Sequence, residues 1–294
     1  MLNRFVTASV AILALLLTSS RAFSENEIFD VLTQRGLEVA PQEIVKLSQP
    51  LLADDAPPAQ RKAIETLTAD RYDWKTFTRN STNSPFLLKI NGGENDSNRV
   101  GRQVDLYFLA YGPLDKLKID NYLQEQLGIA SSESHSGESG SARVLTGDDI
   151  KKRGLLTAAN EDERWVAVES AFLGKVRINL TTHNQRTSTA DSVLLASVAD
   201  PRFNRDPEFP NMWRSIVVDD AGNRQLGPPQ PYASLGSYMK ATQLTEPLGA
   251  LFIEYHVVFA EPHDWFHGAN LLRSKLPVVA QDMVRKIRRN LNAH

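Results

Sequence analysis

Residues 249–291, GALFIEYHVVFAEPHDWFHGANLLRSKLPVVAQDMVRKIRRNL, contain two apolar segments with different periods. From Ala250 to Phe259 the apolar side chains alternate between two faces, which predicts a strand. After Ser274 they recur every three or four residues, which predicts a long helix. Ser274 can cap this helix, and Pro277 then lies in its first turn, where its missing N–H is tolerated. The chain therefore closes with a strand followed by a helix.

The apolar stripe of the predicted C-terminal helix is expected to pack on this strand. It consists of Leu276, Val279, Ala280, Met283, Val284, Ile287 and Leu291. Basic side chains crowd the last turns, where they suit the negative end of the helix dipole. Arg288 and Arg289 are therefore expected on the solvated side of the helix.

The segments before this unit predict an α+β fold. Residues 24–80 have helical patterns, with a helix after Ser24 and a second short segment from Pro41 to Leu47. Consecutive strands without intervening helices favour antiparallel pairing. They are predicted at residues 86–90, 103–111, 165–172, 174–182, 192–199, 213–218 and 236–244.

We expect an N-terminal helical segment at residues 23–84 and an α+β domain at residues 85–294. The domain would consist mainly of an antiparallel sheet on which the C-terminal helix packs. Residues 131–142 are rich in Ser, Gly and Glu, which predicts a mobile loop because they can bury little apolar surface.

The closing strand, the Glu261-Pro262 connection and the long helix resemble the end of START-type domains of the helix-grip class. The resemblance covers the second half of the chain and includes no diagnostic residues. It implies a curved antiparallel sheet wrapped around the C-terminal helix, often with a lipid or another apolar ligand between them. This resemblance adds a candidate ligand class to the α+β fold.

The first residues are typical of a signal peptide. Arg4 is followed by an apolar run from Phe5 to Leu17, and Ser20 and Ala22 fit the small residues at a cleavage site. The apolar run is shorter than the roughly 20 residues of a membrane-spanning helix, which disfavours an uncleaved anchor. We expect cleavage after residue 22 and export to the periplasm or the extracellular space, with no transmembrane segment in the mature chain.

Composition narrows the function classes. The 294 residues carry a formal charge of −2 and contain no cysteine, so disulfides and thiolate metal sites are excluded. The charge disfavours a nucleic-acid binder, which is usually basic. Phosphate-binding, dinucleotide-binding and nucleophile-elbow motifs are missing. We therefore expect no cofactor.

Glu254 and His256 are the candidate binding residues. They lie two apart on the predicted strand, so their side chains point the same way within possible reach of each other. Such a pair could act as an acid and a base or orient a ligand in a cavity. The alternative is a partly exposed sheet face.

His263 and His267 are weaker candidates, for a metal site. They lie four apart, as in His-Glu-x-x-His, with His256 as a conceivable third ligand. Pro262 places His263 outside any helix, which disfavours a shared metal. Ser237 and Lys240 match Ser-x-x-Lys, but on a strand their side chains would lie on opposite faces.

These observations favour an exported, non-enzymatic protein that binds an apolar small molecule or lipid between sheet and helix. One alternative is a hydrolase or metal-dependent enzyme that uses Glu254, His256, His263 or His267. Another is a structural or interaction protein without a pocket. The sequence identifies no particular ligand, substrate or partner.

Overall fold

The computed structural model of the chain describes residues 26–52, 57–91, 101–118, 140–155, 162–219, 222–232, 234–266 and 271–292. The expected signal peptide and residues 131–139 of the expected loop lie outside these residues. Ser141 and Ala142, the end of that loop in the sequence prediction, instead begin a strand.

Most of the described chain is β-strand, in two antiparallel sheets. A small sheet pairs β1 (Leu37–Ala40) with β2 (Glu43–Val45). The large sheet has eleven strands, which are β3 (Phe86–Asn91), β4 (Gly101–Tyr111), β5 (Ser141–Val144), β6 (Glu163–Phe172), β7 (Val176–Ser188), β8 (Ser192–Ala199), β9 (Met212–Val218), β10 (Arg224–Leu226), β11 (Gln230–Pro231), β12 (Leu235–Gln243) and β13 (Ala250–Ala260).

The helices are short except at the C-terminus. They are α1 (Glu27–Asp30), the π-helical η1 (Val31–Arg35), α2 (Pro57–Thr68), α3 (Trp74–Phe77), α4 (Asp115–Lys118), α6 (Gly147–Lys151), the 3-10 turns η2 (Pro201–Phe203) and η3 (His263–Trp265), and α7 (Leu271–Asn292). This architecture confirms the predicted α+β class with a long C-terminal helix.

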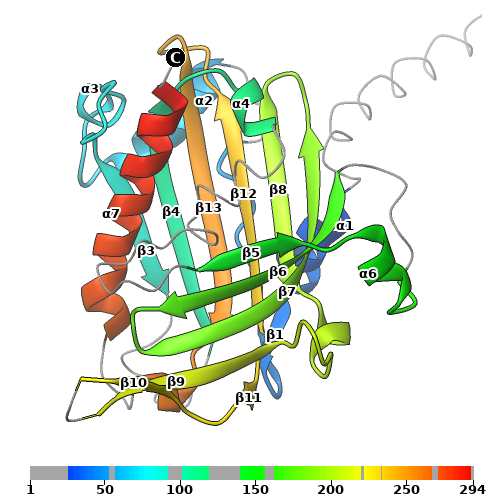
Figure 1. Cartoon of the computed structure of the whole chain (residues 1–294). Helices are drawn as coiled ribbons and strands as arrows, with labels where there is room; N and C mark the ends of the chain where they lie inside the picture. Colours follow the sequence, from blue (N-terminus) through cyan, green and yellow to red (C-terminus); the bar gives the residue numbers. More distant parts are fainter. Residues whose placement is uncertain are drawn as a thin grey trace, which may run out of the picture.

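The large sheet changes direction at β7. Along the sheet the order is β10-β9-β7-β8-β12-β13-β4-β3, and β6 with β5 continues from β7 as a branch. Residues 182–188 of β7 pair with β8, whereas residues 176–179 pair with β9. Figure 1 shows the result: β3, β4, β13, β12 and β8 run nearly upright, and β5, β6, β7 and β9 cross them at a steep angle.

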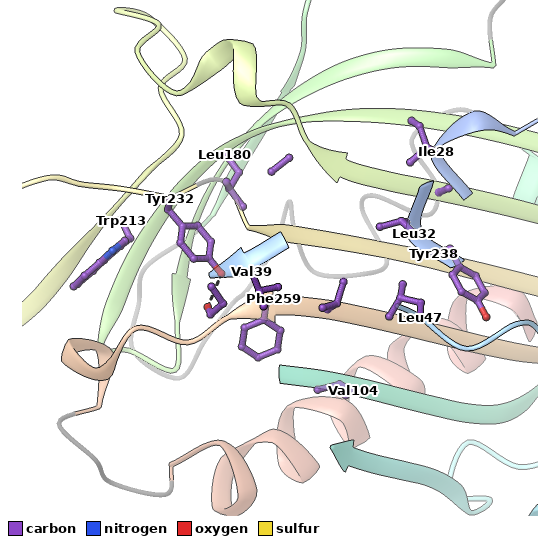
Figure 2. Close-up of a cluster of buried hydrophobic side chains, with 14 of the residues drawn as sticks. Ile28, Leu32, Val39, Leu47, Val104, Leu180, Trp213, Tyr232, Tyr238 and Phe259 are labelled. Atoms are coloured by element: carbon purple, nitrogen blue, oxygen red, sulfur yellow. Dashed lines mark hydrogen bonds between the residues drawn. The ribbon is translucent and has the colours of Figure 1, made fainter. Parts of the chain in front are cut away.

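The N-terminal residues cover one side of the upright strands, which we call the outer face. Ile28, Phe29 and Leu32 pack into a cluster with Tyr238 of β12, and Figure 2 shows Leu32 and Leu47 beside this tyrosine. Leu32 occupies the space that a side chain at position 236 would need, because a Cβ on Gly236 would lie 2.4 Å from Leu32 Cδ2. Further along, α2 and α3 bury Ile64 and Phe77 against the same face.

Helix α7 covers part of the opposite side, the inner face. Ala280, Val284, Ile287 and Leu291 are buried against apolar residues of the upright strands, among them Phe108 of β4. This packing confirms that the C-terminal helix is part of the core. The first turns differ from the prediction: α7 begins at Leu271, so Pro277 lies inside it, and Val279 is 47% exposed.

Arg288 corrects the prediction that the basic residues of α7 are solvated. Its side chain is buried and donates to the main-chain carbonyls of Leu109 at 2.7 Å, Ser84 at 2.5 Å, Pro85 at 2.9 Å and Thr82 at 3.3 Å. Burial lowers the pKa of Arg288 to about 10, so the guanidinium stays charged at neutral pH. Arg288 therefore binds the end of α7 to the sheet.

The helical prediction for residues 24–80 is wrong between Gly36 and Val45. Gly36 has a φ of 88°, which ends the helical turn, and β1 and β2 then form a hairpin. β1 packs on β12 and β13 of the large sheet. These tertiary contacts favour a strand and outweigh the weak local preference of these residues for a helix.

Candidate functional site

Glu254 and His256 lie on the outer face of β13. His256 is directly opposite Tyr238 of β12 and Asp105 of β4, whereas Glu254 is opposite Lys240 and Tyr107. The alternation of side chains along three adjacent strands thus brings six polar groups together. We call this set the polar cluster: Asp105, Tyr107, Tyr238, Lys240, Glu254 and His256.

His256 lies at the centre of the polar cluster. Its Nδ1 is 2.7 Å from Asp105 Oδ1, and its Nε2 is 3.6 Å from Glu254 Oε2, an ionic contact longer than a hydrogen bond. The ring of Tyr238 stacks on the imidazole with centroids 4.5 Å apart, and Tyr107 meets it edge-on at 5.4 Å. The side chains of Glu254 and His256 are 0% exposed.

Residues 46–52, the cover segment, lie over the polar cluster. The Tyr238 hydroxyl donates to the Ser48 carbonyl at 2.6 Å, and the Leu51 amide donates to Glu254 Oε2 at 2.7 Å. Lys240 Nζ donates to the Leu52 carbonyl. Three cluster side chains therefore satisfy main-chain groups of the cover segment, and no strand pairing is needed to hold it.

Burial and charge oppose each other in the polar cluster. Burial lowers the pKa of His256, but its interactions with Asp105 and Glu254 outweigh this effect and raise the pKa above the ordinary value. Burial raises the pKa of the Tyr107 and Tyr238 hydroxyls, so both stay neutral. With His256 protonated, two cations face two carboxylates. Glu254 Oε1 and His256 Nε2 make no hydrogen bond to the described residues.

The structure brings Glu254 and His256 together as the sequence predicts, but on the face turned away from α7. The binding role of the pair stays a prediction. The sequence analysis did not connect Asp105 or Lys240 with this pair, although both occupy alternating strand patterns. Those patterns could have identified them only if the pairing of β4, β13 and β12 had been known.

Of the weaker metal candidates, the structure describes only His263, and it does not lie with His256. His263 lies in η3 with its side chain 78% exposed, and His267 lies outside the described residues. Among the residues that the structure describes, no three His, Asp or Glu side chains are placed to share a metal ion. Ser237 and Lys240 lie on opposite faces of β12, as predicted.

The inner face is incompletely covered in its middle. Tyr255 and Val257 of β13 and Leu195 of β8 are only half-buried, although each strand has hydrogen-bonded neighbours on both sides. Burial raises the pKa of the Tyr255 phenol, and a hydrogen bond with Ser237 opposes that rise. Tyr255 is therefore deep in the molecule and still partly exposed, and we call the partly exposed surface of Tyr255, Val257 and Leu195 the open area.

Some apolar side chains of β5 and α7 are also incompletely buried. Val144 of β5 is 40% exposed, and the register places it on the same face as Val166 of β6. On α7, Val278 and Val279 are 55% and 47% exposed, and Met283 is half-buried. Partly exposed apolar side chains thus occur on both the sheet and α7.

A row of uncharged polar groups crosses the inner face. Asn184, Ser197 and Ser237 lie directly opposite one another on β7, β8 and β12, and Ser237 bonds to Tyr255. Two arginines on the same face, Arg102 and Arg186, have partners of opposite charge. They form the pairs Arg102–Glu261 at 2.5 Å and Arg186–Asp162 at 2.7 Å.

No helix within the described part of the chain is both long and apolar enough to cross a lipid bilayer.

Comparison with known proteins gives likenesses of low similarity. No family model and no curated protein sequence matches the chain. The human StarD13 (DLC2) lipid transfer and protein localization domain is 6% identical, with a TM-score of 0.43 over 79% of this chain and 96% of that domain. An uncharacterised protein from Rhizobium leguminosarum is 8% identical, with a TM-score of 0.33 over 70% and 99% of the two chains. Protein Ms6760 from Mycobacterium smegmatis is 10% identical, with a TM-score of 0.30 over the same shares.

Proposed function

We propose that the protein binds an apolar small molecule or lipid on the inner face, between the sheet and α7. The observation that carries this proposal is the half-buried state of Tyr255, Val257 and Leu195 in the middle of the sheet. Burial of apolar surface contributes roughly 25 cal/mol per Å². A ligand that covers the exposed parts of these side chains would therefore gain binding free energy from their burial. Large contiguous apolar patches on monomeric proteins commonly mark binding sites.

The polar row indicates the ligand chemistry. Hydroxyl and amide groups recognise a neutral hydroxyl or carbonyl, whereas a desolvated carboxylate or phosphate needs a charged partner. Because Arg102 and Arg186 are already paired, the inner face favours a ligand with a neutral polar group. A long-chain alcohol or a sterol has this combination.

A larger side chain at Val257 should block this binding. In the Val257→Trp protein the indole would fill the open area, so the affinity for a fluorescent long-chain alcohol is expected to fall at least about tenfold, or 1.4 kcal/mol. A fluorescence titration with the purified protein measures this change.

Ile44→Trp is the matched control. Ile44 is 61% exposed on β2, which belongs to the hairpin on the outer face. The same substitution there should leave the affinity unchanged. Equal affinities in the wild-type and Val257→Trp proteins would rule out the inner face as the binding site.

For Glu254 and His256 we favour a different role from catalysis. An enzyme needs substrate access to its acid and base, and both side chains are completely buried beneath the cover segment. Their contacts support a role in holding the cover segment on the outer face. We therefore propose no ligand site at the polar cluster.

We infer that the chain is exported and processed after Ala22, because of the short apolar run and the small residues before this position. N-terminal sequencing of protein recovered outside the cytoplasm is expected to begin at or near Phe23. Recovery of the chain with intact Met1 from the membrane fraction would contradict this inference.

A further inference from the structure

His256 is an ionisable group at the centre of the polar cluster, and its protonation changes the balance of positive and negative charge there. Asp105 and Glu254 bring two negative charges, and Lys240 brings one positive charge. We propose that protonated His256 supplies the fourth charge and that loss of its proton releases the cover segment, so that the cluster acts as a pH-sensitive switch. This inference is independent of ligand binding on the inner face.

All elements packed around His256 contribute to its electrostatic surroundings. β4 contributes Asp105 and Tyr107, β12 contributes Tyr238 and Lys240, and β13 contributes Glu254. On β3, exposed Lys89 lies over the Tyr107 ring with Nζ 5.6 Å from its centroid. The only ionisable side chain of the cover segment, Lys46, is exposed. Lys89 is directly opposite Asp105 in the pairing of β3 with β4. His256 is the group whose two ring nitrogens face Asp105 and Glu254.

Loss of the His256 proton acts on the cover segment through Glu254. With a neutral imidazole, the buried carboxylates of Asp105 and Glu254 lose the positive charge that lies between them. Unpaired buried charges are costly, and hydration of Glu254 would relieve that cost. The Glu254 side chain is 0% exposed beneath the cover segment, so water reaches its carboxylate when that segment, with the Leu51 amide bonded to Oε2, moves away.

The direction of the pH dependence follows from linkage. The pKa of His256 is raised in the closed state. Its stabilising contribution is therefore complete below the ordinary value of about 6.5 and is lost as the pH rises through the raised pKa. Within this window the opening equilibrium should rise up to about tenfold per pH unit, the slope for one proton.

Hydrogen exchange at the Leu51 amide tests the switch. Its protection factor, which removes the intrinsic pH dependence of exchange, should be constant below about pH 6.5 and then fall by up to about tenfold per unit. The amide of Ile216, which donates to Lys175 far along the sheet, is the control and should show no such fall. A Leu51 protection factor that is flat across this range would overturn the proposal.

Two variants separate the proton from the hydrogen bonds. His256→Gln removes the titration, so the protection of Leu51 should lose its pH dependence. Tyr238→Phe removes only the bond to Ser48, so the protection should fall while its pH dependence remains. If both variants lose the pH dependence, the loss in His256→Gln would result from general loosening of the cover segment and not from removal of the titrating group.

The wild-type protein provides a test that needs no variant. An NMR titration of the His256 ring should give a midpoint above 6.5 that matches the pH at which Leu51 protection levels off. A neutral His256 at pH 6, with Leu51 still protected, would overturn the proposal even if His256→Gln fails to fold.

Discussion

Replacing Arg288 with Met is expected to lower the free energy of unfolding by about 3–5 kcal/mol. Met preserves much of the apolar stem but removes the donors to the carbonyls of Leu109, Ser84 and Pro85. Each buried carbonyl left without a partner costs about 1–3 kcal/mol. Chemical denaturation followed by circular dichroism measures the loss.

Arg289→Ala is the control for this variant. Arg289 is the next residue on α7 and is exposed, so its replacement should change the stability by no more than about 0.5 kcal/mol. Equal effects at the two positions would show that the bonds of Arg288 do not hold α7 on the sheet.

Replacing Lys240 with Met should also cost about 3–5 kcal/mol, the penalty for removing one partner from a buried charge group. Lys240 is 1% exposed and directly opposite Glu254, so its loss removes a positive charge from beside a buried carboxylate. The Leu52 carbonyl loses its donor as well. Thermal or chemical unfolding of the purified variant measures the effect, and Lys46→Met in the exposed part of the cover segment is the control.

A second substitution tests whether charge causes this loss. Glu254→Gln keeps an acceptor for the Leu51 amide and removes one negative charge. Added to Lys240→Met, it should recover at least about 1 kcal/mol, because the remaining Asp105 and His256 form a balanced pair. A double variant less stable than Lys240→Met would contradict the charge balance.

The sequence predicts the central strands because the two faces of each strand have different surroundings, and the side chains alternate accordingly. The apolar alternation in β13 and β4 agrees with the register of the sheet, and the helical stripe of α7 identifies Val284, Ile287 and Leu291 correctly. Prediction from the sequence fails where a segment distant in the chain determines whether a side chain is buried. Arg288 looks like an ordinary basic residue at a helix end, and only its packing against β4 and the loop at residues 82–85 makes it a buried donor.

The candidate site shows the same limit. Alternation indicates that Glu254 and His256 share a face. Whether that face turns toward α7 depends on which alternate residues of every strand in the sheet pack on the helix. The hairpin β1–β2 and the cover segment occupy the outer face, and their short, mixed patterns do not predict this placement. The polar cluster therefore became visible only with the strand pairing.

The most direct test of the proposed function is photocrosslinking with a long-chain alcohol that carries a diazirine. After irradiation and digestion, adducts are expected on the inner face, at Tyr255, Val257, Leu195 or Met283, and excess unlabelled alcohol should abolish them. Leu248, 88% exposed in the turn before β13, reports non-specific contact and should stay unlabelled. Adducts concentrated on Leu248 and Ile44, with none on the inner face, would contradict binding between the sheet and α7.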